Sequence, residues 1–167
     1  KIPTLLGVLN SIFFQAWQLS AIEEFDSKDK SDYYSKIFSL YSKFIFCGAS
    51  GVLLILKPFT SIAINQKFAT SWEFVPLLLM SVVYSSFSGF LGKYYAASRR
   101  SVGAFNTTIY GAIINIICNL VFIPLLGLQG AGLSSLVSFL FLWILRQVTT
   151  QSIVKTKLNI KNILLNN

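Results

Sequence analysis

The sequence is poor in the residue types that most enzymes and metal sites use. It contains no histidine, only two cysteines and only six acidic residues. Cys47 and Cys118 lie far apart and have no Cys-x-x-Cys spacing, so they are most simply small apolar packing residues. No catalytic set of acids, histidine or metal ligands occurs near a predicted helix end. We therefore expect no metal, no cofactor and no enzymatic activity.

Charge is also scarce, and long stretches have none. Only 12% of the residues are charged and 54% are hydrophobic, whereas soluble proteins average about 25% charged residues. A soluble all-helical domain would need polar faces at helical spacing, and the last long uncharged stretch shows almost none. The composition therefore indicates a membrane protein. The uncharged stretches are residues 2–21, 74–92 and 101–145.

The apolar runs have the length of membrane helices. A helix rises about 1.5 Å per residue and the hydrocarbon layer is about 30 Å thick, so a span needs about 20 residues. Pro3 and Pro76 fall in first turns, and Pro58 and Pro124 follow last turns, where proline is tolerated. We predict an all-α polytopic membrane helix bundle over residues 1–149, followed by a cytoplasmic tail over 150–167. Its five transmembrane helices are expected near residues 3–22, 36–56, 73–95, 103–123 and 129–149.

The positive charges fall mostly on one side of these spans. Eleven Lys and Arg residues lie on the side of the first loop, the third loop and the tail, and three lie on the other. Because cytoplasmic loops are enriched in Lys and Arg, the C-terminus is predicted to be cytoplasmic. The net charge of +8 borders spans rather than forming a stripe on a soluble fold. We expect contacts with membrane lipids and no nucleic-acid partner.

Polar side chains inside the first two spans are candidates for a substrate cavity. Asn10, Gln15 and Gln18 form a polar run that either bonds to neighbouring helices or lines a watery cavity. Amides suit sugar hydroxyls because they both donate and accept hydrogen bonds. Lys43 lies well inside its span and either extends to the headgroups or faces the cavity and attracts phosphate. Gln15, Gln18 and Lys43 are the predicted cavity residues.

Charges in two predicted cytoplasmic loops are candidates for an inner gate. Five acids crowd the first loop, and Glu23 and Glu24 lie at a helix C-terminus, where the macrodipole disfavours negative charge. The next cytoplasmic loop carries Arg99 and Arg100. We predict a closing contact between these loops, with a solvated charge run as the alternative.

The last two spans carry residues suited to helix packing. In lipid there is little hydrophobic force between helices, so close approach of small residues and hydrogen bonds between helices must stabilise the bundle. Asn115 and Asn119 are expected to bond to a neighbouring helix. Gly130 and Ser134 are expected to form a close-packing face.

Four segments resemble, in order, the C-terminal lobe of a Wzx-type oligosaccharide flippase of the multidrug/oligosaccharidyl-lipid/polysaccharide exporter superfamily. They are "LSAIEE", "KFATSWEFVPLLLMS", "YAASRRS" and "IYGAIINIICNLVFIPLLGLQGAGLSS". The similarity in pattern covers nearly the whole chain. It implies that the spans correspond to helices 8 to 12 of a twelve-helix, two-lobe transporter. The odd number of spans and the absence of an initiator Met independently favour a C-terminal piece of a larger protein.

Such transporters move undecaprenyl-diphosphate-linked oligosaccharide across the bacterial inner membrane by alternating access, for O-antigen or capsule biosynthesis. The implied partners are the lipid-linked oligosaccharide, the N-terminal lobe of the same protein and the polysaccharide polymerase machinery. No Asp or Glu lies inside a predicted span, so an acid-based proton relay cannot be placed here. The alternatives are a cation or drug exporter of the same superfamily and a membrane assembly subunit that transports nothing.

Overall fold

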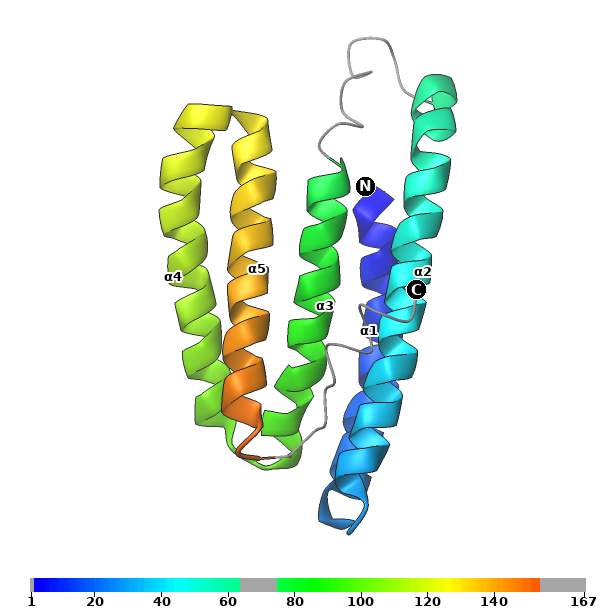
Figure 1. Cartoon of the computed structure of the whole chain (residues 1–167), viewed down its shortest axis with the longest axis vertical. Coiled ribbons are helices and arrows are strands. Elements are labelled where there is room, and N and C mark those ends of the chain that lie inside the picture. Colours follow the sequence, from blue (N-terminus) through cyan, green and yellow to red (C-terminus); the bar gives the residue numbers. More distant parts are fainter. Residues whose placement is uncertain (1, 64–74, 154–167) are drawn as a thin grey trace.

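A computed structural model describes residues 2–63 and 75–153, and in this part of the chain the secondary structure is helical (Figure 1). The predicted all-α fold class is therefore confirmed. The helices are α1 (Ile2–Glu23), the short 3-10 helix η1 (Glu24–Asp26), α2 (Lys30–Ala63), α3 (Val75–Ala97), α4 (Ser101–Leu126) and α5 (Leu128–Thr150).

Four of these helices are long and apolar enough to cross a membrane. They are α2 over Lys30–Ile55 and the whole of α3, α4 and α5. α1 has 22 residues and covers the expected first span, and its crossing of the membrane stays a prediction. By the length and composition of its helices, the chain is a multi-pass membrane protein.

Two helix ends differ from the expectation that proline would terminate them. α2 continues past Pro58 to Ala63, and Pro124 lies within α4. A proline removes one backbone donor, but the remaining backbone bonds on each side can still form. α4 ends instead at Gly127, whose φ of 59° is a left-handed conformation that glycine adopts without strain. The Gly127 amide donates to the Ile123 carbonyl at 2.8 Å and closes the last turn.

The helices stand side by side in the order α4, α5, α3 and then α1 with α2 (Figure 1). α3 is central, because it packs against α5 on one side and against α1 and α2 on the other, whereas α4 packs mainly against α5. The α1–α2 connection, the α3–α4 turn and the end of α5 share one end of the bundle, here termed the lower end. The two loops predicted to be cytoplasmic and the start of the predicted tail are thus on one side, and which side of a membrane this is stays a prediction. Residues 154–167 of the tail lie outside the described residues.

An aromatic cluster forms the core between α1, α2 and α3. The ring of Trp17 stacks on Phe90 with centroids 4.5 Å apart. Tyr41 stacks on both Phe13 and Phe90, at 4.4 and 5.5 Å. These rings are large and rigid, so their stacking fixes the three helices relative to one another in surroundings that supply little hydrophobic force. At the lower end the buried Tyr34 hydroxyl donates to the Ala21 carbonyl and holds the α1–α2 turn.

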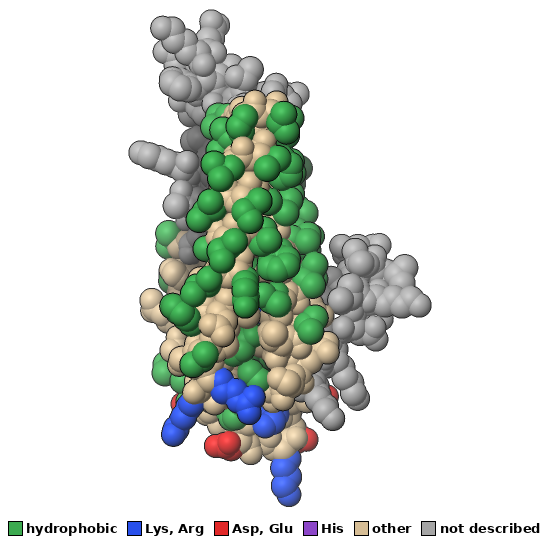
Figure 2. Space-filling view, turned by 90° about the vertical axis from the view of Figure 1, so that its left-hand side faces the viewer, with side chains coloured by type: hydrophobic (Ala, Val, Ile, Leu, Met, Phe, Trp, Pro, Cys, Tyr) green, Lys and Arg blue, Asp and Glu red, His purple; other side chains and the backbone are tan. Residues whose placement is uncertain are grey.

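α4 presents an almost continuous apolar surface. Figure 2 looks onto this side of the molecule and shows hydrophobic side chains along its length, with Lys, Arg, Asp and Glu gathered at the lower end. Leu120 is 73% exposed and Leu125 is 74% exposed. Such a surface is unfavourable in water and matches hydrocarbon. The distribution fits a helix that contacts lipid or another apolar helix over most of its circumference.

The α4–α5 hairpin depends on a very close approach at Gly130. A Cβ atom placed on Gly130 would lie 2.1 Å from the Phe122 carbonyl oxygen. One turn along, Ser134 has no exposed surface, and its hydroxyl donates to the Gly130 carbonyl at 2.7 Å. Gly130 and Ser134 therefore lie in the contact between the two helices.

Gly130→Ala is expected to lower the stability of the bundle by about 1–3 kcal/mol, the usual cost of overpacking, because the backbone of α4 must move away. Thermal unfolding in detergent, followed by circular dichroism, measures the effect. The matched control is Gly51→Ala in α2, where a Cβ atom meets nothing within 4 Å. This control should raise stability slightly, since alanine favours a helix over glycine by about 0.5–1 kcal/mol. Equal shifts for the two variants would contradict the assignment.

Candidate functional site

Polar and charged side chains enter the apolar bundle in three places around α3. One group, the Asn10 triad, consists of Asn10, Tyr41 and Ser86. The Lys93 site consists of Lys93, Gln18 and Phe14. The Arg146 site consists of Arg146, Ser88, Thr107 and Thr108.

The Asn10 triad joins three helices at one point. The Asn10 amide nitrogen donates to the Ser86 hydroxyl at 2.5 Å, and the Tyr41 hydroxyl donates to the Asn10 amide oxygen. Tyr41 and Ser86 are buried. Both polar atoms of the Asn10 side chain have a partner on another helix. This amide is therefore a structural link between α1, α2 and α3.

The Lys93 site lies between α1 and α3, toward the lower end. The Lys93 ammonium donates to the Gln18 amide oxygen at 2.9 Å and lies 5.8 Å from the centroid of the Phe14 ring. Phe14 can approach α3 because Gly89 has no side chain, since a Cβ atom there would lie 2.9 Å from the ring. Lys93 is half-buried. Its other two donors have no partner within the described residues and are available to a polar ligand.

The Arg146 site lies on the opposite side of α3 and joins α3, α4 and α5. The guanidinium donates to the Ser88 carbonyl at 2.9 Å, to the Thr108 hydroxyl at 2.9 Å and to the Thr107 hydroxyl at 3.2 Å. The carbonyl is reachable because Gly92 leaves space, since a Cβ atom there would lie 2.8 Å from Nη1. Arg146 is half-buried, and all of its described partners are neutral.

Neither cation has a carboxylate partner within residues 2–63 and 75–153. The sequence explains this, because no Asp or Glu follows Glu73 and the other five acids lie between residues 23 and 32. Lys93 and Arg146 each lie four residues before the end of their helices, roughly 6 Å from it at 1.5 Å per residue. Cations at that depth can reach the headgroup region and are costly to leave without an anion.

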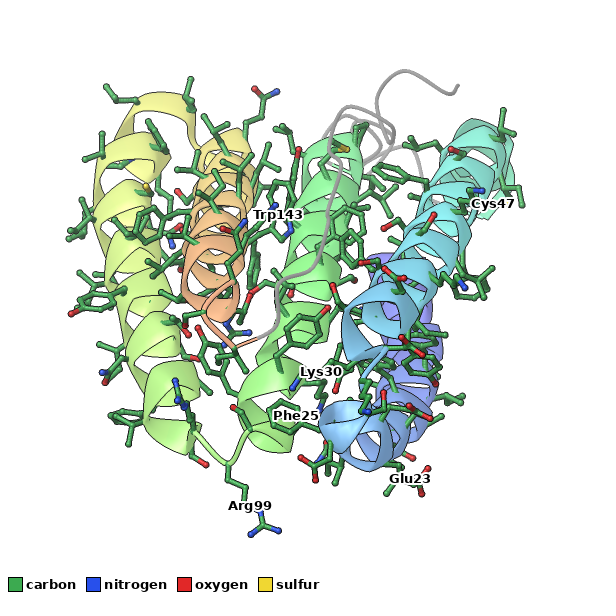
Figure 3. All side chains as sticks on the ribbon, turned by 60° about the horizontal axis from the view of Figure 1, so that its bottom comes forward. Glu23, Phe25, Lys30, Cys47, Arg99 and Trp143 are labelled. Atoms are coloured by element: carbon green, nitrogen blue, oxygen red, sulfur yellow. The ribbon has the colours of Figure 1, made fainter. Side chains whose placement is uncertain are left out.

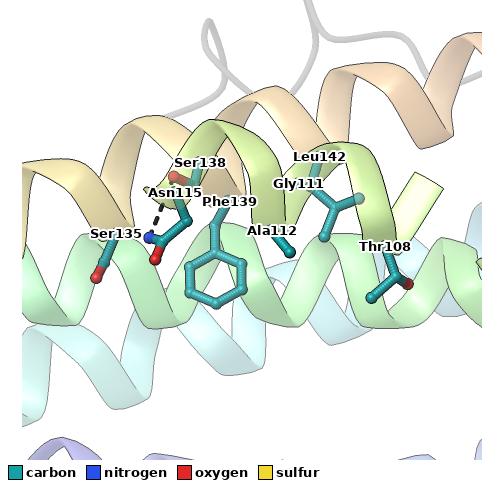
Figure 4. A pocket seen from close by; sticks show the side chains of 8 residues that line it. All are labelled: Thr108, Gly111, Ala112, Asn115, Ser135, Ser138, Phe139 and Leu142. Atoms are coloured by element: carbon teal, nitrogen blue, oxygen red, sulfur yellow. Dashed lines mark hydrogen bonds between the residues drawn. The ribbon is translucent and has the colours of Figure 1, made fainter. Parts of the chain in front are cut away.

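A pocket of about 330 Å³ opens between α4 and α5. Its walls are mostly apolar, and Asn115 and Ser138 are joined across it by a 3.2 Å hydrogen bond, drawn as a dashed line in Figure 4. Thr108, which accepts a hydrogen bond from Arg146, lies at one end. The pocket, here termed the α4–α5 groove, therefore ends at a residue that also contacts Arg146. The lining residues are Thr108, Gly111, Ala112, Asn115, Ser135, Ser138, Phe139 and Leu142.

The three predicted cavity residues have different surroundings. Gln18 is half-buried and bonds to Lys93, whereas Gln15 and Lys43 are exposed on α1 and α2. Lys43 has no hydrogen-bond or ion-pair partner among the described residues. None of the three lines the pocket between α4 and α5. The cation beside Gln18 is therefore Lys93 and not the predicted Lys43.

The predicted gate residues lie at the same end of the bundle. Figure 3 shows Glu23 and Arg99 at the lower end, on the α1 and α3 sides respectively. Glu23, Arg99 and Arg100 are exposed and Glu24 is half-buried, and no ion pair joins these acids to these arginines in the described structure. In the α1–α2 connection, Lys30 lies 4.6 Å from the centroid of the Phe25 ring instead of pairing with an acid. The contact between the two loops stays a prediction.

The two asparagines of α4 act differently from each other. Asn115 donates to the Ser138 hydroxyl of α5, whereas Asn119 donates at 2.9 Å to the backbone and side-chain oxygens of Asn115. The expectation that both amides bond to a neighbouring helix therefore differs from the structure at Asn119. One helical turn places the two amides within reach, so Asn119 orients Asn115 instead of bonding to α5.

From sequence alone, Lys93 and Arg146 are recognisable only as charges that set topology. Hydropathy locates a residue along the membrane normal but does not tell which face of its helix it occupies. For Lys93, the sequence does contain a local signal of close packing, namely Gly89, one turn before it. The missing side chain at Gly89 leaves room for the Phe14 ring beside Lys93. No comparable local signal exists for Arg146, whose partners lie at least 38 positions away in sequence.

No protein-family model, curated protein or solved structure matches this chain. What the chain does must therefore be inferred from these residues, from their geometry and from the resemblance in sequence.

Asn10→Leu is expected to destabilise the bundle by about 1–3 kcal/mol, because the Tyr41 hydroxyl loses its acceptor in a buried position. Asn115→Leu should cost less, about 0.6 kcal/mol, since Ser138 keeps its bond to the Ser134 carbonyl. Thermal unfolding of both variants in one detergent gives the comparison. A larger loss for Asn115→Leu would contradict the structural role assigned to the Asn10 triad.

Proposed function

We propose that the chain is part of a flippase that moves undecaprenyl-diphosphate-linked oligosaccharide across the bacterial inner membrane by alternating access, for surface polysaccharide biosynthesis. The observation that carries the proposal is the Lys93 site. It places a half-buried cation, which has no carboxylate partner among the described residues, next to an amide within a mostly apolar bundle. The sequence resemblance supports the same function.

The chemistry of this substrate suits such a site. A diphosphate and several sugars cannot cross about 30 Å of hydrocarbon unaided, because their polar groups would lose water without replacement. The ammonium of Lys93 offers charge-assisted hydrogen bonds to phosphate oxygens, and the Gln18 amide can donate to and accept from sugar hydroxyls. Gln15 and Lys43, which are exposed on α1 and α2, are proposed to face the same cavity when the other lobe is present.

The charges at the lower end fit a gate in this scheme. A two-state transporter changes which end of its cavity is open, and each state needs contacts that the other lacks. Glu23 and Glu24 lie on one side of the lower end and Arg99 and Arg100 on the other, unpaired with each other in the described conformation. We propose that they meet in the state closed at this end.

The two alternative functions predict different features. A cation exporter needs an anionic group in the membrane to bind its substrate, and no acid lies between residues 33 and 72 or after residue 73. A subunit that only binds partner helices does not need a half-buried cation with donors to spare. The Lys93 site therefore favours the flippase.

Lys93→Gln is expected to reduce flipping by about tenfold or more, since a hydrogen bond to a charged group is worth about 1.5–3 kcal/mol. The full-length gene is deleted, and the variant is tested for restoring surface polysaccharide. The undecaprenyl-diphosphate-linked oligosaccharide that remains in the inner membrane is extracted and quantified. Glutamine keeps the length and the polarity, so a change in transport without a change in protein level reports on the charge.

Lys28→Gln is the matched control, because Lys28 is exposed in the α1–α2 turn at the same end. It should transport like the unmodified protein. Deletion of the gene without accumulation of lipid-linked oligosaccharide would overturn the flippase function. Loss of a purified membrane complex in that strain, with normal polysaccharide, would identify an assembly subunit instead.

A further inference from the structure

The α4–α5 groove and the Arg146 site are adjacent, because Thr108 belongs to both. We propose that one anionic phospholipid binds here, with its phosphate on Arg146 and one acyl chain in the groove between α4 and α5. The site lies on the opposite side of α3 from the Lys93 site, and the inference does not depend on the proposed transport function.

The cation supplies the first reason. Arg146 has five N–H donors, and the three described hydrogen bonds go to a carbonyl and two hydroxyls. Two donors remain, and no carboxylate of the described structure compensates the charge. A guanidinium is planar and suits two oxygens of one phosphate. A phosphate therefore provides both the missing charge and acceptors for the remaining donors.

The groove supplies the second reason. Its volume of about 330 Å³ is near the lower limit of ligand pockets, about 300 Å³, so it suits a hydrocarbon chain better than a sugar-linked headgroup. Phe139, Leu142 and Ala112 give it apolar walls. Gly111 brings α4 close to Leu142, since a Cβ atom there would lie 3.4 Å from the leucine side chain. Figure 4 shows these side chains along the groove.

The groove runs along the helix axes, which is also the direction of the acyl chains of a membrane lipid. Thr108 lies at the Arg146 end, and Asn115 lies seven residues along α4, roughly 10 Å further toward the upper end. Arg146 is near the lower end of α5. A lipid with its headgroup at the lower surface would therefore point its acyl chain along the groove. Free phosphate would pair with Arg146 but leave the apolar groove empty. A lipid without net charge would fill the groove but leave the charge of Arg146 uncompensated.

Native mass spectrometry of the full chain in detergent tests the site. Phosphatidylglycerol is titrated in, with phosphatidylcholine of the same acyl chains and inorganic phosphate as the other two probes. The unmodified chain should bind one phosphatidylglycerol about tenfold more tightly than phosphatidylcholine, and phosphate should not displace it. Arg146→Gln should remove this preference, because glutamine retains hydrogen bonding without charge.

Arg146→Gln also weakens the contact between three helices, so a second variant separates binding from folding. Ala112→Phe fills the groove from an exposed position of α4 and leaves the guanidinium intact. It should fold normally and bind phosphatidylglycerol about tenfold more weakly. Lys28→Gln removes one charge from the same end and should bind normally. Equal binding of both lipids, displacement by inorganic phosphate, or unchanged binding by Ala112→Phe would overturn the proposal, whatever the outcome of the transport assay.

Discussion

The guanidinium of Arg146 links the α4–α5 hairpin to α3, the central helix of the bundle. From α5 it reaches the backbone of α3 and two hydroxyls of α4, so a single side chain sets the spacing of three helices. This requires a glycine at position 92, where any side chain would occupy the space of the guanidinium. In lipid, where apolar surfaces gain little by meeting each other, such polar links and close contacts replace the hydrophobic force of a soluble core. The aromatic cluster plays the same part between α1, α2 and α3.

The number and approximate position of the helices follow from local composition. Charge-free runs of about 20 residues are visible without knowledge of neighbours, and α3, α4 and α5 begin and end within a few residues of the expected spans. The ends of α2 were less predictable. Its first turns contain charged residues such as Lys30 and Asp32 that extend the helix beyond an apolar window, and Pro58 does not end it. Whether a helix stops at a proline depends on the glycine or turn that follows, as Gly127 illustrates for α4.

The polar sites required knowledge of which residues face each other. Tyr41 and Ser86 lie 31 and 76 positions from Asn10 in the sequence, so only the folded bundle brings the three residues together. Asn115 and Ser138 belong to one hairpin, and a bond between α4 and a neighbouring helix could be expected from sequence alone. Residue type identifies Gln18 as a candidate, whereas the sequence presents its partner Lys93 only as one of the charges that set topology. Residue type therefore identified polar positions, and only the packing of α3 between its neighbours paired them.

The single-residue turn at Gly127 has a mechanical consequence. α4 ends at Leu126 and α5 begins at Leu128, so the connection between them is a single residue and cannot lengthen. Neither helix can slide along the membrane normal past the other, and the Gly130 contact with Phe122 also restricts their separation at that end. The upper ends of α4 and α5 therefore move together. A conformational change that displaces the upper end of α5 against α3 must therefore displace the adjoining end of α4 as well.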